Sequence, residues 1–235
     1  MKSITPQTVQ EHKVLQGLCH FIPRHVNNRF LLYAMECLRL PSRKKLRNRH
    51  LADNKSNLRK EQGFLNNQKS YRKIFYGKER FSYSGCEVIA LYNALLGLGH
   101  PRPLHELIYY FEKKGLLLQG SFGTSLLSVY RYLKRREESL SANVRLLTKQ
   151  GAILKALDSC DGMIFMFYNN QSDLSEMIHT IYIHVQKKET IKTYEACNVE
   201  LNGSPCGPFQ TKKELLKALS IDTIGPIAGI TLYKR

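Results

Sequence analysis

The spacing of apolar residues along the chain changes near residue 144. Before that position apolar residues recur at helical intervals, whereas beyond it short apolar runs alternate with turn residues in the manner of strands. The first part predicts helices at residues 7–40 with a break near Pro23, 86–97, 104–114 and 125–136. The second part predicts strands at residues 144–147, 162–168, 177–186, 190–194 and 229–233, with short helices at residues 152–157 and 211–219. Helices followed by an antiparallel sheet predict an α+β fold.

The stretch from Phe81 to Gly99 changes from a polar turn into an apolar helix at Cys86. If residues 83–85 form the turn, Cys86 lies in the first turn of the helix, where unpaired amide N–H groups and the helix dipole favour a thiolate. A cysteine in this position is either a nucleophile or a small apolar residue that opens a core helix. The nucleophile interpretation requires a histidine from a distant part of the chain.

Two histidines lie on the predicted strand that begins near residue 177. Side chains five residues apart on a strand point to opposite faces, so only one of His179 and His184 can face Cys86. His179 is at the beginning of the strand, where a side chain can reach a cleft, and His184 is nearer the following turn. We therefore expect His179 to be the base, although a histidine on a strand is more often a hydrogen-bonded structural residue.

A Cys–His pair needs a third group that orients the imidazole. The second strand of the hairpin contains Glu195 and ends at Asn198. A hairpin turn centred on residues 187–189 puts position 197 opposite His179, so both candidates are within one or two residues of the required place. Each also has an ordinary interpretation, a surface acid and a turn asparagine. The register leaves the choice between them open.

The segments Ser84–Leu96, Gly123-Thr124, His179–Ile181 and Tyr194-Glu195 resemble bacterial papain-like cysteine peptidases. Within that family the chain resembles the peptidase domains that remove double-glycine leaders from bacteriocins. The resemblance covers roughly residues 80–235. It implies a papain-like fold, in which a helix with the thiolate packs on a small antiparallel sheet with the base. It also implies hydrolysis of peptide bonds through an acyl-enzyme, with a peptide or protein as substrate.

The resemblance also implies roles for particular residues. Cys86 is the nucleophile, His179 is the general base and then the general acid, and Glu195 or Asn198 is the orienting residue. The family has a glutamine about six residues before the cysteine as a donor to the oxyanion, and this chain has Arg80 there. Losing one such donor costs about 100- to 1000-fold in rate. We therefore expect a weak or inactive peptidase-like protein, in which the backbone N–H of Cys86 still donates and Arg80 or Ser82 is the candidate replacement for the glutamine.

Charge divides the chain into two parts. Residues 1–80 contain 18 Lys and Arg against 5 Asp and Glu, a net charge of +13, whereas residues 81–235 have a net charge of +4. We predict a basic, mainly helical extension at residues 1–78 and a peptidase-like domain at residues 79–235. The basic run 43–50 leads into the polar stretch 53–60, an exposed linker or a mobile helix. The alternative function is a non-catalytic module that docks on nucleic acid, a membrane surface or another anionic partner through residues 39–60.

Cysteine spacing and hydropathy argue against a zinc protein, a disulfide-rich protein and a membrane protein. The six cysteines form no C-x-x-C pair, so we expect free thiols and neither a zinc site nor a disulfide scaffold nor any cofactor. The N-terminus lacks the apolar region of a signal peptide, and no stretch approaches about 18 consecutive apolar residues. These features predict a cytoplasmic protein. The cysteines are Cys19, Cys37, Cys86, Cys160, Cys197 and Cys206.

Overall fold

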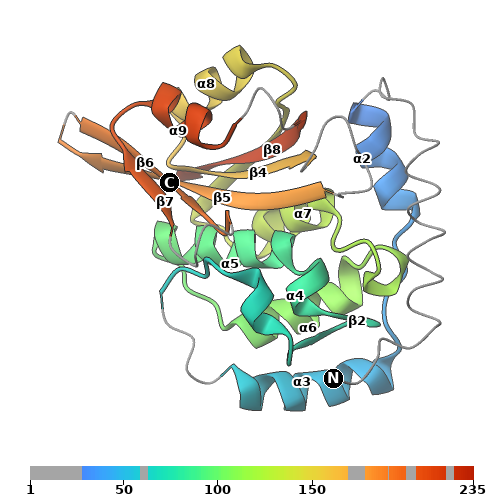
Figure 1. Cartoon of the computed structure of the whole chain (residues 1–235). Helices are drawn as coiled ribbons and strands as arrows, with labels where there is room; N and C mark the ends of the chain where they lie inside the picture. The colour runs from blue at the N-terminus through green and yellow to red at the C-terminus, as the bar shows by residue number, and fades with distance from the viewer. Residues whose placement is uncertain (1–27, 59–62, 169–177, 190, 200–204, 221–224) are drawn as a thin grey trace.

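A six-stranded antiparallel sheet forms the upper half of the molecule (Figure 1). The computed structural model describes residues 28–58, 63–168, 178–189, 191–199, 205–220 and 225–235. The strand order is β3-β8-β4-β5-β6-β7. The bounds are β3 Leu140–Leu146, β4 Gly162–Tyr168, β5 Ile178–Lys188, β6 Ile191–Cys197, β7 Cys206–Phe209 and β8 Gly225–Lys234. The antiparallel sheet and the helices before it confirm the predicted α+β class.

Helices cover both faces of this sheet (Figure 1). The helix α5 packs on one face against β4 and β5, with α6 and α7 beside it, and α8 and α9 cover the other face. A short hairpin, β1 Phe75–Tyr76 and β2 Glu79–Arg80, lies next to α4. The helices are α2 Asn28–Cys37, α3 Lys44–Asn57, α4 Phe81–Ser84, α5 Cys86–Leu98, α6 Leu104–Lys114, α7 Leu126–Arg136, α8 Gln150–Ser159 and α9 Lys212–Ala218, with 3-10 turns η1 Gln68–Tyr71 and η2 Leu118–Gly120.

Two apolar clusters follow from the alternation of side chains along the strands. Tyr182 of β5 packs in the cluster around α5, whereas its neighbours Ile181 and Ile183 pack in the cluster under α8 and α9. Eleven of the thirteen residues of α5 are buried, which accounts for its nearly continuous apolar sequence. The sheet is thus buried on both faces, and α5 is the central helix of the larger cluster.

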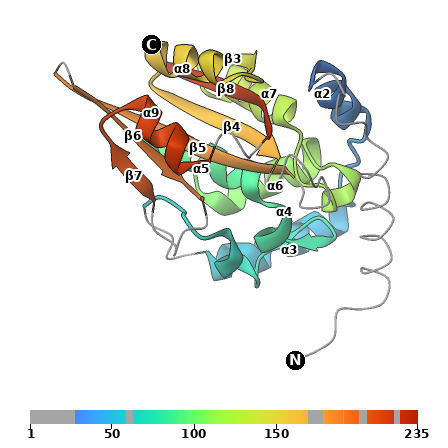
Figure 2. The ribbon, with the colours of Figure 1, turned by 45° about the horizontal axis from the view of Figure 1, so that its top comes forward.

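The helix α2 packs into the same core as the later helices. Leu31, Leu32 and Met35 of α2 belong to the cluster around α5. Figure 2 shows α2 beside α7, at the end of the sheet where β8 begins. The predicted boundary near residue 78 stays a prediction, although residues on both sides of it share one cluster. The part of the predicted helical region before residue 28 lies outside the described residues.

The polar stretch after the basic run forms a helix. Of the two alternatives for residues 53–60, linker or helix, the structure has α3 through Asn57. Asn54 is fully buried, and its side-chain amide bonds both backbone groups of Phe75, at 2.9 Å to the carbonyl oxygen and 3.0 Å from the amide nitrogen. These two bonds attach an otherwise hydrophilic helix to the β1–β2 hairpin.

The register between β5 and β6 differs from the expected one. Tyr182 pairs with Cys197 and Lys188 pairs with Ile191, so the two strands extend further toward the turn than the sequence suggests. Lys187 and Lys188 look like turn residues but are the exposed end of β5. The prediction that position 197 lies opposite His179 is therefore wrong.

Candidate active site

Cys86 is the first residue of α5, as the sequence predicts. The preceding residues 81–84 form the short helix α4, and the amide of Gly85 donates to the carbonyl oxygen of Phe81 at 2.9 Å. A Cβ atom on Gly85 would lie 2.6 Å from the ring and the carbonyl oxygen of Phe81, so a side chain there would displace α4. Gly85 thus allows the tight junction that directs Cys86 toward the sheet.

One cavity of about 240 Å³ contains both Cys86 and His179 in its lining. These residues are 93 positions apart in the sequence, on α5 and at the beginning of β5. The backbone amide of Thr180, the residue after His179, is a hydrogen-bond donor to the Cys86 sulfur. The structure therefore brings together the two residues that the sequence pairs.

The hydrogen bond of His179 fixes the tautomer of its ring. Its Nε2 atom lies 2.7 Å from the backbone carbonyl oxygen of Asn198. Because a carbonyl oxygen only accepts, Nε2 holds the proton, and in the neutral ring Nδ1 is then the basic atom. This tautomer is the one in which Nδ1 can accept a proton from a thiol in the cavity.

His184 lies at the opposite end of α5. Its Nδ1 atom is 3.0 Å from the Tyr182 hydroxyl, and a Cβ atom on Gly97 would lie 2.9 Å from it. Burial lowers the pKa of His184, with a further contribution from Lys234. Since Gly97 is near the end of the helix that Cys86 begins, the half-buried His184 lies far from Cys86 along α5.

Asn198 contacts His179 through its backbone. Its carbonyl accepts from His179, whereas its fully buried side chain bonds Gln68. Glu195 pairs with His184 across the strands and does not line the cavity. The proposal of Glu195 as the orienting residue is therefore wrong, because the hairpin register places it about five residues along β5 from His179.

A glutamine that the sequence analysis did not consider also lines the cavity. Gln68 of η1 is 4% exposed, and its backbone amide donates to Asn198 Oδ1 at 3.2 Å while its Oε1 accepts from Asn198 Nδ2 at 3.3 Å. Its Nε2 atom has a long bond of 3.4 Å to the carbonyl oxygen of Phe81. It lies 18 residues before Cys86, beyond the six-residue spacing that pointed to Arg80. The β1–β2 hairpin between Gln68 and Cys86 accounts for the longer spacing.

The two expected oxyanion donors have different positions. Ser82 is half-buried and lines the cavity. Arg80 is exposed, does not line the cavity, and places its guanidinium carbon 4.1 Å from the centre of the Phe75 ring. The structure thus uses Arg80 in a cation–π contact on the β1–β2 hairpin, and the proposal of Arg80 as a donor in the site is wrong.

Burial dominates the electrostatics of the cavity. It raises the pKa of the Cys86 thiol well above its ordinary value, and the neighbouring Glu87 carboxyl raises it further. Burial also raises the pKa of Glu87 to about 7, although its carboxylate accepts from the Thr124 amide at 3.3 Å. Burial and the Glu87 carboxyl together outweigh the predicted stabilisation of a thiolate by the helix N-terminus. In this state Cys86 is a neutral thiol that needs a base.

The described ranges contain neither a candidate metal site nor a candidate membrane-spanning helix. No group of three or more His, Cys, Asp or Glu side chains there could hold a metal ion. No helix in the same ranges is long and apolar enough to cross a membrane. The thiols of Cys37, Cys86, Cys160, Cys197 and Cys206 are free, and Cys19 lies outside these ranges.

Comparison with known proteins gives no relative. The chain matches no protein family, no curated protein and no solved structure. The papain-like interpretation therefore depends on the cavity residues themselves.

Proposed function

We propose that this protein is a cysteine peptidase-like hydrolase that cleaves peptide bonds with Cys86 and His179. The observation that supports it is one cavity lined by a cysteine at the start of a buried helix and a histidine on the adjacent sheet. The histidine tautomer has Nδ1 as its basic atom, as a general base for a thiol requires. The geometry matches the general pattern of nucleophile, base and orienting group.

In the proposed reaction, His179 Nδ1 takes the proton of the Cys86 thiol as the sulfur attacks the carbonyl carbon of the substrate. The C–N bond then breaks, and the leaving amine takes the proton from His179, which leaves a thioester on Cys86. A water molecule gives a proton to His179 and attacks the thioester. The C–S bond breaks, the carboxylic acid leaves, and Cys86 recovers its proton. The raised pKa of the thiol makes the first proton transfer essential.

Gln68 supplies the oxyanion donor in this proposal, in place of Arg80 or Ser82. Its bond from Nε2 to Phe81 is long enough for a substrate oxyanion to compete, and Asn198 holds the other side of its amide group. The backbone amide of Cys86, at the start of α5, is a second candidate donor. This assignment removes the reason to expect an inactive protein, because a neutral amide donor lines the cavity.

The test compares the two histidines of β5. Iodoacetamide at near-neutral pH should alkylate Cys86 about tenfold or more slowly in His179→Ala than in the natural protein, because the base is lost. His184→Ala is the matched control and should leave that rate unchanged. Peptide mass spectrometry measures Cys86 and the exposed Cys37 in the same digest, so Cys37 is an internal reference.

Cleavage of a mixed peptide library tests the reaction itself. New peptide termini should form with the natural protein and with His184→Ala, and should be absent with Cys86→Ser and His179→Ala. Equal alkylation of Cys86 in both histidine variants, or cleavage that persists in Cys86→Ser, would disprove the proposed mechanism.

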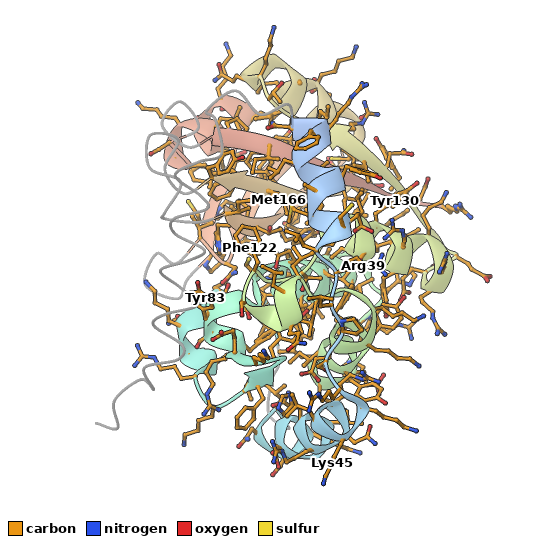
Figure 3. All side chains as sticks on the ribbon, turned by 90° about the vertical axis from the view of Figure 1, so that its right-hand side faces the viewer. Arg39, Lys45, Tyr83, Phe122, Tyr130 and Met166 are labelled. Atoms are coloured by element: carbon orange, nitrogen blue, oxygen red, sulfur yellow. The ribbon has the colours of Figure 1, made fainter. Side chains whose placement is uncertain are left out.

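One observation favours a second candidate function, the binding of a nucleic acid. Arg43, Lys44, Lys45 and Arg49 are exposed around the first half of α3, whose first turn contains no acidic residue. Figure 3 shows Lys45 at one end of the molecule, away from Phe122. If this surface binds phosphates, Lys44→Glu/Lys45→Glu should weaken binding to a fluorescent oligonucleotide and reduce its salt dependence. Unchanged binding would exclude this role for α3.

A further inference from the structure

The cavity has an apolar part that the proposed chemistry does not use. Met35 of α2, Tyr83 of α4, Phe122 and Ile178 line it together with Cys86 and His179. Met35 is buried and Phe122 is half-buried, whereas Tyr83 is 43% exposed. Figure 3 views the molecule from the side of α2 and labels Tyr83 and Phe122 near each other on this face. Four separate segments, α2, α4, the loop after η2 and β5, thus contribute apolar surface to the cavity that contains the reactive sulfur.

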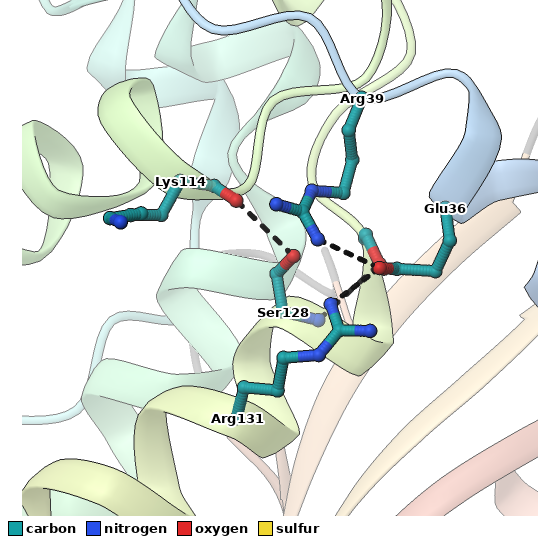
Figure 4. A network of polar contacts seen from close by, with 6 residues as sticks. Glu36, Arg39, Lys114, Ser128 and Arg131 are labelled. Atoms are coloured by element: carbon teal, nitrogen blue, oxygen red, sulfur yellow. Dashed lines mark hydrogen bonds and ion pairs between the residues drawn. The ribbon is translucent and has the colours of Figure 1, made fainter.

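A hydrogen-bonded network holds α2 in this place (Figure 4). The carboxylate of Glu36, the residue after Met35, accepts from Arg39 Nη1 at 2.9 Å. It also accepts from Arg131 of α7 and from Ser125, the residue before α7. Burial acts to raise the pKa of Glu36, but these hydrogen bonds outweigh it and lower the pKa, so the carboxylate stays charged. The network therefore fixes the part of α2 that presents Met35 to the cavity.

Both ends of the α2 segment are attached as well. The side-chain amide of Asn28 donates to the carbonyl oxygen of Ile227 at 3.3 Å, and the amide of Leu118 donates to the carbonyl oxygen of Leu38 at 3.0 Å. The second bond links α2 to the loop that contains Phe122. Met35 and Phe122 are consequently held by a rigid frame, which is what a binding site that discriminates between ligands needs.

We propose that Met35, Phe122 and Tyr83 form an apolar subsite that binds a large apolar side chain of the peptide substrate, close to the bond that Cys86 attacks. This inference depends on the proposed function. The cavity of about 240 Å³ is smaller than the roughly 300–1,000 Å³ of a site for a whole drug-sized ligand. It suits one side chain with its adjoining backbone. Of the two charged side chains in the lining, Glu87 bonds the Thr124 amide and Lys69 is exposed.

The experiment uses two peptidyl chloromethyl ketones of one scaffold, with Leu or Asp as the residue next to the reactive group. The rate of Cys86 alkylation is measured by mass spectrometry for each. The natural protein should prefer the Leu compound by about tenfold or more, since apolar pockets discriminate on that scale. The preference should fall severalfold in Met35→Ala and in Phe122→Ala.

Exposed aromatic residues of α2 are the matched controls. Phe30 and Tyr33 are 63% and 67% exposed, so Phe30→Ala and Tyr33→Ala should keep the preference for Leu. Met35 is part of the core, so Met35→Ala could fail to fold. Phe122 is only half-buried, so Phe122→Ala still tests the subsite if Met35→Ala does not fold. Iodoacetamide, which has no side chain, reports in every variant whether Cys86 retains its His179-dependent reactivity.

The outcomes separate the subsite from the proposed function. Equal rates for the Leu and Asp compounds, with intact His179-dependent alkylation by iodoacetamide, would overturn the subsite and leave the peptidase proposal standing. A preference for Leu that Phe122→Ala does not alter would also overturn it. Loss of the His179 dependence in the natural protein would overturn both, because the subsite depends on the reaction.

Discussion

The buried carboxyl of Glu87 should make the protein less stable at alkaline pH. Its pKa is about 7 in the folded protein, against an ordinary value of 4.5, because burial disfavours the charged form. Between these two values the folded chain binds more protons than the unfolded chain, so the free energy of unfolding falls as the pH rises. At about 1.4 kcal/mol per pH unit, the whole change is about 3 kcal/mol. This loss of stability is absent below pH 4.5 and complete above pH 7.

Glu87→Gln removes this dependence, because an amide does not ionise and its oxygen can still accept from the Thr124 amide. The assay is urea denaturation of both proteins at pH 5 and pH 8. The free energy of unfolding of the natural protein, relative to that of Glu87→Gln, should be lower at pH 8 by about 2–3 kcal/mol. The comparison between pH values cancels any packing cost of the substitution itself.

Glu138 provides the control for this prediction. It is exposed, so Glu138→Gln should show the same pH dependence as the natural protein. If the difference between Glu87→Gln and the natural protein is the same at pH 5 and pH 8, within about 0.5 kcal/mol, Glu87 does not titrate in this range and the reasoning from burial is refuted.

Four further predictions concern the cavity and its surroundings. Glu87→Gln should speed the alkylation of Cys86 by iodoacetamide at pH 8, because a nearby negative charge is lost; an equal or slower rate would contradict the electrostatic argument. Gln68→Ala should lower the turnover of an activated ester about 100- to 1000-fold and leave iodoacetamide alkylation unchanged; unchanged turnover would exclude Gln68 as the oxyanion donor. Arg80→Ala should leave ester turnover within about twofold and cost only about 0.5–1 kcal/mol of stability, as expected for an exposed cation–π contact; a large loss of turnover would return Arg80 to the site. His50→Leu should lower the free energy of unfolding by about 3–5 kcal/mol, because the buried Glu112 carboxylate loses its partner His50 Nδ1, which lies 2.6 Å away. Urea denaturation measures the loss, and a value below about 1 kcal/mol would show that the pair contributes little.

The sequence alone predicted the helix that begins with Cys86 and the strand that contains His179. The apolar run of β4 and the helix starting at Cys86 match the structure closely, because periodicity and the Gly85-Cys86 junction are local signals. The choice of His179 over His184 also followed from the sequence, because two residues five apart on a strand cannot share a face and His179 is the one at the beginning of the strand. These features needed no knowledge of how distant segments meet.

Only the tertiary structure decided which other residues reach the cavity. Gln68 enters it because η1 folds against α4, and Met35 enters it because the Glu36 network holds α2 beside α7. Glu195 is excluded by the register of a hairpin whose polar end continues as strand. The protonation state of Cys86 also depends on tertiary packing, because burial and the adjacent Glu87 outweigh the helix N-terminus. Distances between side chains that are far apart in sequence, and the dielectric around them, exist only once the chain has folded.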